Sequence, residues 1–221
     1  MPPTWTILVP TLGERRALFE RLMAGLLPQL DPYAGRARVV GWFNNGSPSL
    51  PKIRQTMIQS ADTGYVSFVD DDDLVAPYFV DEVMTALADQ PDYVGFQVQC
   101  YSDGAPTAVA YHSLEHRRWK NYPGRYERDI SHINPIRTDI ARRGRFDRVG
   151  AGMAEDRAWA EQIRHTKLLR SEIVIPRIMY HYLYSTSRTP GEGSRWQIDR
   201  KIHPGERSLI EHPHFTWSPD A

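Results

Sequence analysis

The sequence has little cysteine: Cys100 is the only one, so no disulfide can form within the chain, which fits a reducing compartment. It has no apolar run that approaches the roughly 18 to 20 residues of a membrane-spanning helix. Its first residues carry no basic segment followed by a long apolar stretch, so we expect no signal peptide. These absences favour a cytoplasmic protein without a membrane span.

The sequence also lacks net charge, with 27 Lys plus Arg against 27 Asp plus Glu. The charges are nevertheless segregated along the chain. Residues 62–103 hold ten acidic residues and no Lys or Arg, whereas residues 115–148 hold ten Lys or Arg against five acidic residues. This pattern predicts a site that holds a cation close to a site that meets phosphate.

Hydrophobic periodicity predicts an α/β protein. Strands are expected at 5–10, 38–43, 65–69 and 93–98, and helices at 14–30, near 53–58 and at 79–87. This alternation is typical of a mainly parallel sheet. Later segments predict a hairpin with loops within 100–135, a helix at 156–163, and strands at 173–175 and 178–183. We expect residues 1–185 to form one domain, on which residues 186–221 pack as an arm or loop.

Polar residues follow three of the expected strands. These are Thr11-Leu12-Gly13, Asn44-Asn45-Gly46 and the run Asp70 to Asp73. Because ligands of parallel α/β sheets bind beyond the carboxyl ends of the strands, we expect the functional residues to gather there.

The run of four aspartates indicates a metal site. If the segment is extended, Asp70 and Asp72 point to one side and Asp71 and Asp73 to the other. One such pair could hold Mg²⁺ or Mn²⁺, which takes one or two carboxylates and completes its shell with water and phosphate oxygens. The alternative is an acidic turn that caps the helix beginning near Pro77, a role that Asp73 alone could fill.

Several segments together resemble the family 2 glycosyltransferases of GT-A fold. They are ILVPTLGER, FNNGS, KIRQ, YVSFVDDDDLVAPYF and GRFDRVGAGMAEDRAW, which occur in the family's order between residue 5 and about residue 184. The resemblance implies a GT-A fold, a single Rossmann-like mixed sheet flanked by helices. It also implies a metal-dependent inverting enzyme that moves a sugar from a nucleotide-diphosphate sugar to a hydroxyl group.

The resemblance also assigns roles to residues. Asp70 and Asp72 would bind the metal and the donor diphosphate, and Asp156 would be the catalytic base, with Glu155 positioning the acceptor or the sugar. The donor-binding set that it implies is Pro10, Thr11, Glu14, Asn44, Arg54, Asp70 and Asp71. Family members usually carry an aspartate at the place of Asn44, whose amide can still bind a base or ribose. The expected donor is a UDP-sugar.

Two of these roles have a structural alternative. Glu155 and Asp156 could instead stabilise a helix N-terminus through its dipole. His181 is the candidate third metal ligand, because many metal-dependent members of this fold supply a late histidine, although a histidine on a strand is more often a core residue.

The acceptor is the least defined part of the prediction. Aromatic and basic side chains alternate at Arg117, Arg118, Trp119 and Lys120, which could bind an acceptor that carries phosphate; one hypothesis is hydroxymethylated DNA. The rival functions are a nucleotidyltransferase of similar fold, which would want a more glycine-rich first loop, and a non-catalytic sugar-binding module. The sequence does not define the oligomeric state.

Overall fold

A computed structural model describes residues 2–44, 47–148 and 155–185, together with the backbone of 215–217. The strands are β1 (Trp5–Leu12), β2 (Ala37–Asn44), β3 (Tyr65–Phe68), β4 (Leu74–Val75), β5 (Tyr93–Ser102), β6 (Ala105–His112), β7 (Lys120–Tyr122), β8 (Arg125–Arg128), β9 (Ile136–Arg137), β10 (Glu172–Tyr184) and β11 (Phe215–Trp217). The α-helices are α1 (Arg16–Leu26), α2 (Leu50–Ser60), α3 (Phe79–Leu87), α4 (Thr138–Ala141) and α5 (Glu155–Thr166).

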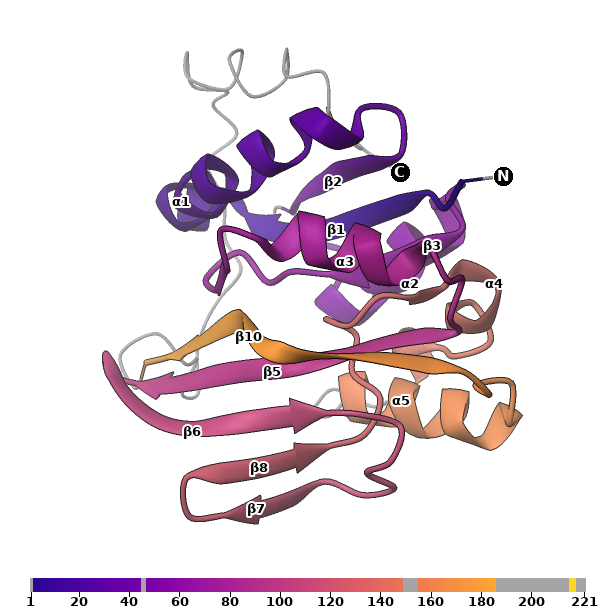
Figure 1. The fold of residues 1–221 in the computed structure, drawn as a ribbon. Coiled ribbons are helices and arrows are strands. Elements are labelled where there is room, and N and C mark those ends of the chain that lie inside the picture. The colour runs from indigo at the N-terminus through magenta and orange to yellow at the C-terminus, as the bar shows by residue number, and fades with distance from the viewer. Residues whose placement is uncertain (1, 45–46, 149–154, 186–214, 218–221) are drawn as a thin grey trace.

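The strands of the described residues form one mixed sheet, in the order β11-β2-β1-β3-β9-β5-β6-β8-β7 (Figure 1). β1 pairs in parallel with β2 and β3, whereas β9 runs antiparallel to β3 and β5. β10 pairs in parallel with β5 and, near its end, antiparallel with β4. Because β1, β2 and β3 run in the same direction, their carboxyl ends meet at one edge of the sheet.

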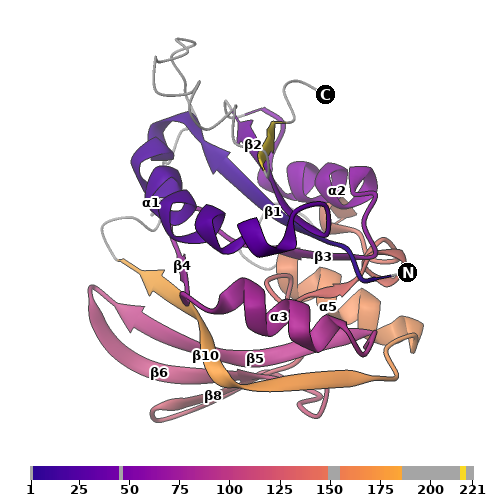
Figure 2. The same cartoon turned by 45° about the horizontal axis from the view of Figure 1, so that its top comes forward.

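Helices cover both faces of the sheet (Figure 2). α1 and α3 pack on one face, where Phe19 and Phe79 join a core with Ile7 of β1. α2, α4 and α5 cover the other face, where a second core contains Trp159 of α5 together with Leu8 of β1. Neighbouring residues of β1 thus enter different cores, as the two-residue period of a strand requires.

Several predicted elements differ in extent from those observed, and prolines account for two of the differences. The predicted helix 14–30 ends at Leu26, and 3₁₀ turns follow at Leu27–Gln29 and Asp31–Tyr33. Pro28 lies in the first of these turns, and proline cannot continue a helix because it has no N–H to donate. The two late strands are one strand, β10, whose register with β5 shifts between Ile175 and Ile178. Pro176 lies in that interval, where a missing N–H is tolerated.

The C-terminal segment is described only at β11, which adds to β2 in parallel, with Phe215 opposite Val39. The rest of the predicted arm, 186–214 and 218–221, lies outside the described residues, as do 45–46 of the second polar turn and 149–154 of the GRFDRVGAGMAEDRAW segment. Of the helices described, none is long and apolar enough to cross a membrane.

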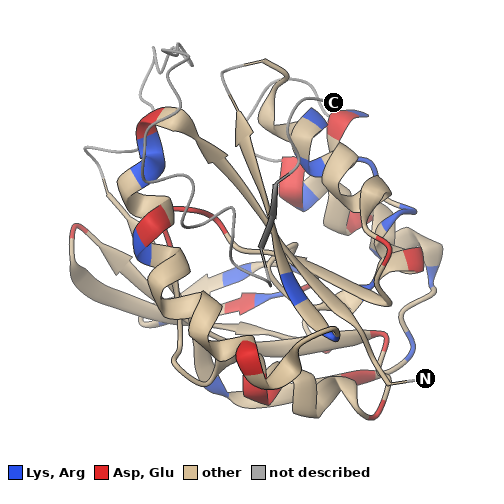
Figure 3. Cartoon of the chain, turned by 90° about the horizontal axis from the view of Figure 1, so that it is seen from above, with Lys and Arg blue, Asp and Glu red and all other residues tan. Residues whose placement is uncertain are grey.

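The charge segregation of the sequence does not persist in the fold, where acidic and basic residues are interspersed (Figure 3). Acidic residues of 62–103 pair with arginines from other parts of the chain: Asp70 with Arg54, Asp71 and Asp72 with Arg15, Glu82 with Arg177, and Asp92 with Arg137. Arginines of the protein itself therefore offset part of the negative charge of residues 62–103.

Candidate active site

Two cavities lie at the carboxyl ends of the strands. The smaller, about 200 Å³, is lined by the ends of β1 and β2 and by the aspartate turn, including Thr11, Asn44 and Asp72. The larger, about 1180 Å³, extends from there between the start of α5 and the inner side of β5, β6, β8 and β10. Four residues line both cavities and form the wall that they share: Leu50, Arg54, Asp70 and Tyr182.

The aspartate run is a turn rather than an extended segment, because the Asp73 amide donates to the Asp70 carbonyl at 3.2 Å. The predicted alternation of the four side chains is therefore wrong. Asp70, Asp71 and Asp72 all line the smaller cavity, whereas Asp73 accepts hydrogen bonds from the Tyr180 hydroxyl at 2.8 Å and the Leu183 amide at 2.7 Å. Asp73 thus anchors β10 to the turn and does not cap α3, whose start has no side-chain cap.

Arg15 holds the next two carboxylates. One guanidinium nitrogen lies 2.7 Å from Asp71 Oδ1 and the other lies 2.7 Å from Asp72 Oδ2. Asp71 is fully buried and also accepts a hydrogen bond from the Thr11 hydroxyl at 2.6 Å. Burial nevertheless raises the pKa of Asp71 to about 6, more than the attraction of Arg15 lowers it. Both aspartates line the smaller cavity, and Asp72, whose side chain is 25% exposed, is the more accessible of the two.

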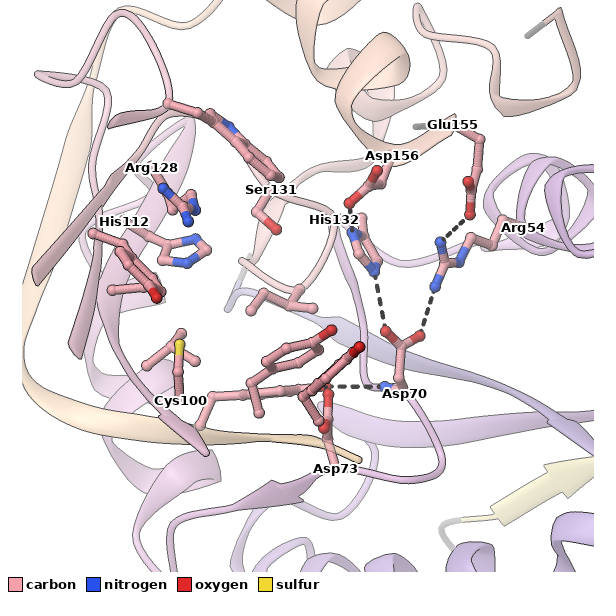
Figure 4. A pocket seen from close by; sticks show the side chains of 18 of the residues that line it. Arg54, Asp70, Asp73, Cys100, His112, Arg128, Ser131, His132, Glu155 and Asp156 are labelled. Atoms are coloured by element: carbon pink, nitrogen blue, oxygen red, sulfur yellow. Dashed lines mark hydrogen bonds and ion pairs between the residues drawn. The ribbon is translucent and has the colours of Figure 1, made fainter. Parts of the chain in front are cut away.

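Arg54 of α2 makes the corresponding link on the shared wall (Figure 4). Its side chain is only 5% exposed and donates to Asp70 Oδ1 at 2.6 Å and to Glu155 Oε1 at 2.8 Å. Burial by itself would raise the pKa of Asp70, but Arg54 and the contact with His132 outweigh it and leave that pKa well below its usual value. Asp70 is therefore an anion at any pH near neutrality.

Packing of α5 fixes where its first carboxylates lie. Trp159, one turn into the helix, stacks on Phe146 with ring centroids 5.0 Å apart and donates its indole N–H to the Ala141 carbonyl at 3.2 Å. Gly144 leaves room for this indole, since a Cβ there would lie 2.5 Å from the Trp159 ring. Glu155 and Asp156, at the start of the same helix, consequently line the larger cavity.

His132 joins the two ends of this carboxylate group and was not anticipated from the sequence. Its Nε2 lies 3.5 Å from Asp70 Oδ2 and its Nδ1 lies 3.9 Å from Asp156 Oδ2. The residue is 7% exposed, and in the part of the chain that the structure describes neither ring nitrogen has a hydrogen-bond partner. No motif surrounds His132, and only the antiparallel return through β9 brings it beneath β3, where its carbonyl accepts from the Phe68 amide at 2.8 Å.

The site offers two of the three ligands that were predicted for a hard divalent cation. Asp70 and Asp72 line one cavity and each side chain is about a quarter exposed (26% and 25%), so two carboxylates of the kind that Mg²⁺ or Mn²⁺ accepts are within its reach. The predicted third ligand does not join them. His181 lines neither cavity, its Nδ1 lies 3.5 Å from the Tyr101 hydroxyl, and the described residues contain no cluster of three metal-ligating side chains.

Some of the other predicted site residues line the cavities and others do not. Pro10, Thr11, Asn44, Arg54, Asp70 and Asp71 line the smaller cavity, as expected for a donor set, but the exposed Glu14 does not. Of the predicted acceptor residues, Trp119 lines the larger cavity, whereas Arg117, Arg118 and Lys120 do not. Arg128 does line it, as do Lys52 and Arg54. Sequence reasoning missed Arg128 because nothing distinguishes it from its basic neighbours.

His112, deep in the larger cavity, gives the first testable prediction. It is 6% exposed with Nδ1 2.8 Å from Asn134 Oδ1, and burial lowers its pKa to about 3, against the opposing effect of that hydrogen bond. In the unfolded chain the His112 imidazole takes up a proton near pH 6.5, whereas in the folded protein it stays neutral. The free energy of unfolding should therefore fall as the pH drops below 6.5. From pH 8 to pH 5 the free energy of unfolding should drop by about 2 kcal/mol more in the wild type than in His112→Gln. Urea unfolding at the two pH values measures the drop. Equal losses in the two proteins would show that His112 is not held neutral.

Solved structures confirm the predicted GT-A fold. Residues 1–349 of S. aureus TarS in complex with UDP-GlcNAc superpose with a TM-score of 0.56 at 14% identity, over 87% of this chain and 60% of that one. The same TarS segment with UDP gives 0.54 at 15% identity, over 82% and 61%. A longer TarS structure gives 0.55 at 13% identity, over 81% of this chain and 36% of TarS. This chain thus spans between about a third and three fifths of the length of those proteins. No family model and no curated protein matches the sequence.

Proposed function

We propose that this protein is a glycosyltransferase that moves a sugar from a nucleotide-diphosphate sugar, with a UDP-sugar as the expected donor, to a hydroxyl group. The observation that carries the proposal is the shared wall: Asp70 and Arg54 stand between a small cavity at the strand ends and the carboxylate of Asp156 in the large one. A donor whose phosphates lie at this wall would place its sugar in the larger cavity. TarS, which has this fold, binds UDP-GlcNAc and UDP, and this supports the proposal.

The smaller cavity would take the nucleotide. Thr11 and Asn44 supply polar groups at the strand ends, and Asp70 and Asp72 would hold the divalent cation there. When bound, that cation neutralises charge on the departing diphosphate. Arg15 lines the same cavity with its side chain 29% exposed, so it can offer a second positive charge to phosphate oxygens.

The larger cavity would hold the transferred sugar and the acceptor. The acceptor oxygen forms its bond to the anomeric carbon as the bond to the diphosphate oxygen breaks, and the leaving diphosphate keeps that electron pair. Asp156, which lines this cavity, takes the acceptor's proton as general base. A single displacement of this kind inverts the anomeric centre. Glu155 stays bound to Arg54 and orients it, while His132 lies between the base and the phosphate end.

Nucleotide binding gives the direct test. We expect Asp72→Ala to weaken binding of UDP in the presence of Mn²⁺ by about tenfold or more, because one of two carboxylates at the cation position is lost. Isothermal titration calorimetry measures this, and removal of Mn²⁺ by chelation should weaken binding to the wild type similarly. Asp89→Ala, which removes an exposed acid in the turn that follows α3, is the matched control. Equal affinity of Asp72→Ala and wild type would contradict the assignment.

A further inference from the structure

One end of the larger cavity is built from aromatic rings around a single arginine. Arg128 ends β8, and its guanidinium carbon lies 4.9 Å from the centroid of the Trp119 ring and 4.7 Å from that of Tyr126. All three residues line the cavity. Contact with two rings restricts the side chain, so its donors are held in a fixed place rather than moving freely in solvent.

The charge of Arg128 has no anionic partner among the residues that the structure describes. Its hydrogen bonds run from one nitrogen, Nη1, to the backbone carbonyls of Lys120 at 3.0 Å and Glu127 at 2.9 Å. The nearby carboxylate of Glu127 instead lies against Lys120 and Arg125, at 3.9 and 3.7 Å. Half-burial lowers the pKa of Arg128, which reflects the cost of keeping an uncompensated charge at the cavity. A cation in this position is suited to an anionic ligand.

The opposite end of the cavity carries the carboxylates. Of the other lysine and arginine side chains that line the cavity, Lys52 and Arg54, the latter is already bound by Asp70 and Glu155. Figure 4 shows Arg128 and His112 on one side of the pocket and Glu155 and Asp156 on the other. A ligand with one anionic group would be repelled by the carboxylates and attracted to Arg128, so its orientation would be fixed. Its uncharged hydroxyls would then lie toward Asp156.

The lining of the cavity also offers flat apolar surfaces. Tyr182 and Tyr184 of β10 are 46% and 39% exposed, and both line the cavity, as does Trp119. Exposed aromatic faces of this kind bind rings that have an apolar face and polar edges, which describes a pyranose.

We propose that the acceptor is a sugar that carries an anionic group, a carboxylate or a phosphate, and that Arg128 binds this group while Trp119 and Tyr126 hold the guanidinium in place. This inference rests on the proposed function, since it names the acceptor of the same site. It replaces the predicted acceptor set, of which only Trp119 reaches the cavity.

The experiment measures binding of glucuronate, glucose 6-phosphate and glucose to the full chain in the presence of UDP and Mn²⁺, by saturation-transfer difference NMR titration. At least one charged sugar should bind about tenfold more tightly than glucose, and the two charged probes separate a carboxylate acceptor from a phosphate acceptor. Arg128→Gln should abolish the preference, and Arg128→Lys should keep part of it.

Arg125→Gln is the matched control, because Arg125 lies on the same strand and stacks on Tyr111 at 4.0 Å but does not line the cavity. It should leave the preference unchanged. The inference is overturned if the wild type binds the three sugars equally, if folded Arg128→Gln keeps the preference, or if a hydroxymethylated DNA duplex binds more tightly than both charged sugars. UDP binding in the same samples separates the two proposals. If UDP binds but the charged sugars are not preferred, only the proposal of an anionic acceptor is refuted. If UDP does not bind, the proposed glycosyltransferase function is refuted.

Discussion

Asp156→Asn should lower kcat for sugar transfer by a factor of about 100 to 10,000, the range that a positioned general base supplies. The amide cannot accept the acceptor's proton, but it retains the shape of the side chain and the contact of Oδ1 with the Arg157 amide at 2.7 Å. Affinity for UDP should stay within about twofold of wild type, because Asp156 does not line the smaller cavity. Nucleotide release from a panel of UDP-sugars at saturating Mn²⁺ measures the rate, and calorimetry measures the affinity.

The control for this variant is Glu161→Gln, on the exposed side of the same helix, where Glu161 pairs only with Arg157 among the described residues. It should keep the wild-type rate. If the rate of Asp156→Asn lies within about threefold of wild type, another group must accept the proton of the acceptor hydroxyl. If neither the wild type nor Asp156→Asn releases nucleotide but both still bind sugar nucleotides, the protein is a sugar-binding module rather than an enzyme.

Arg54→Met should lower the free energy of unfolding by about 3 kcal/mol or more, because it leaves Asp70 and Glu155 together without their cation. Arg54 is the most buried cation of the site, and methionine fills similar space without charge. Urea unfolding at neutral pH measures the change. The double variant Arg54→Met/Asp70→Asn should recover part of the loss, since it removes one of the two unpaired anions.

Arg38→Met tests whether burial causes this effect. Arg38 pairs with Asp62 on the surface, with side chains 38% and 72% exposed, and exposed pairs of this kind contribute less than about 1 kcal/mol. We therefore expect a much smaller change than for Arg54→Met. Similar losses in the two variants would mean that the shared wall gains little from the buried ion pairs.

The first half of the fold could be predicted from the sequence because each element has a clear hydrophobic period. β1 was expected at 5–10 and α3 at 79–87, close to the observed Trp5–Leu12 and Phe79–Leu87. In the second half, α5 and β10 were expected close to their observed places, as a helix at 156–163 and strands at 173–175 and 178–183. The strands β7 and β8 could not be placed, since they are short and have no buried period to detect. The antiparallel insertion of β9 between β3 and β5 depends on long-range pairing that no local pattern encodes.

The candidate site follows the same division. Thr11, Asn44 and Asp70 were placed together because parallel strands end at one edge, a general property of such sheets. The geometry of the aspartate turn was missed, because a backbone hydrogen bond between Asp73 and Asp70 decides it and four identical residues do not reveal it. His132 and Arg128 come from segments without a motif, and only tertiary packing brings them to the cavity.

The wall shared by the two cavities has an evolutionary consequence. Arg54 and Asp70 belong to both compartments, so a mutation at either one alters nucleotide handling and sugar placement at once and will rarely be neutral. Arg128 and Trp119 belong to the larger compartment alone, at the far end of a sheet extension formed by β6, β8 and β7. Descendants of this protein can therefore diversify the molecules they modify by changing that extension, while the donor end remains under constant selection.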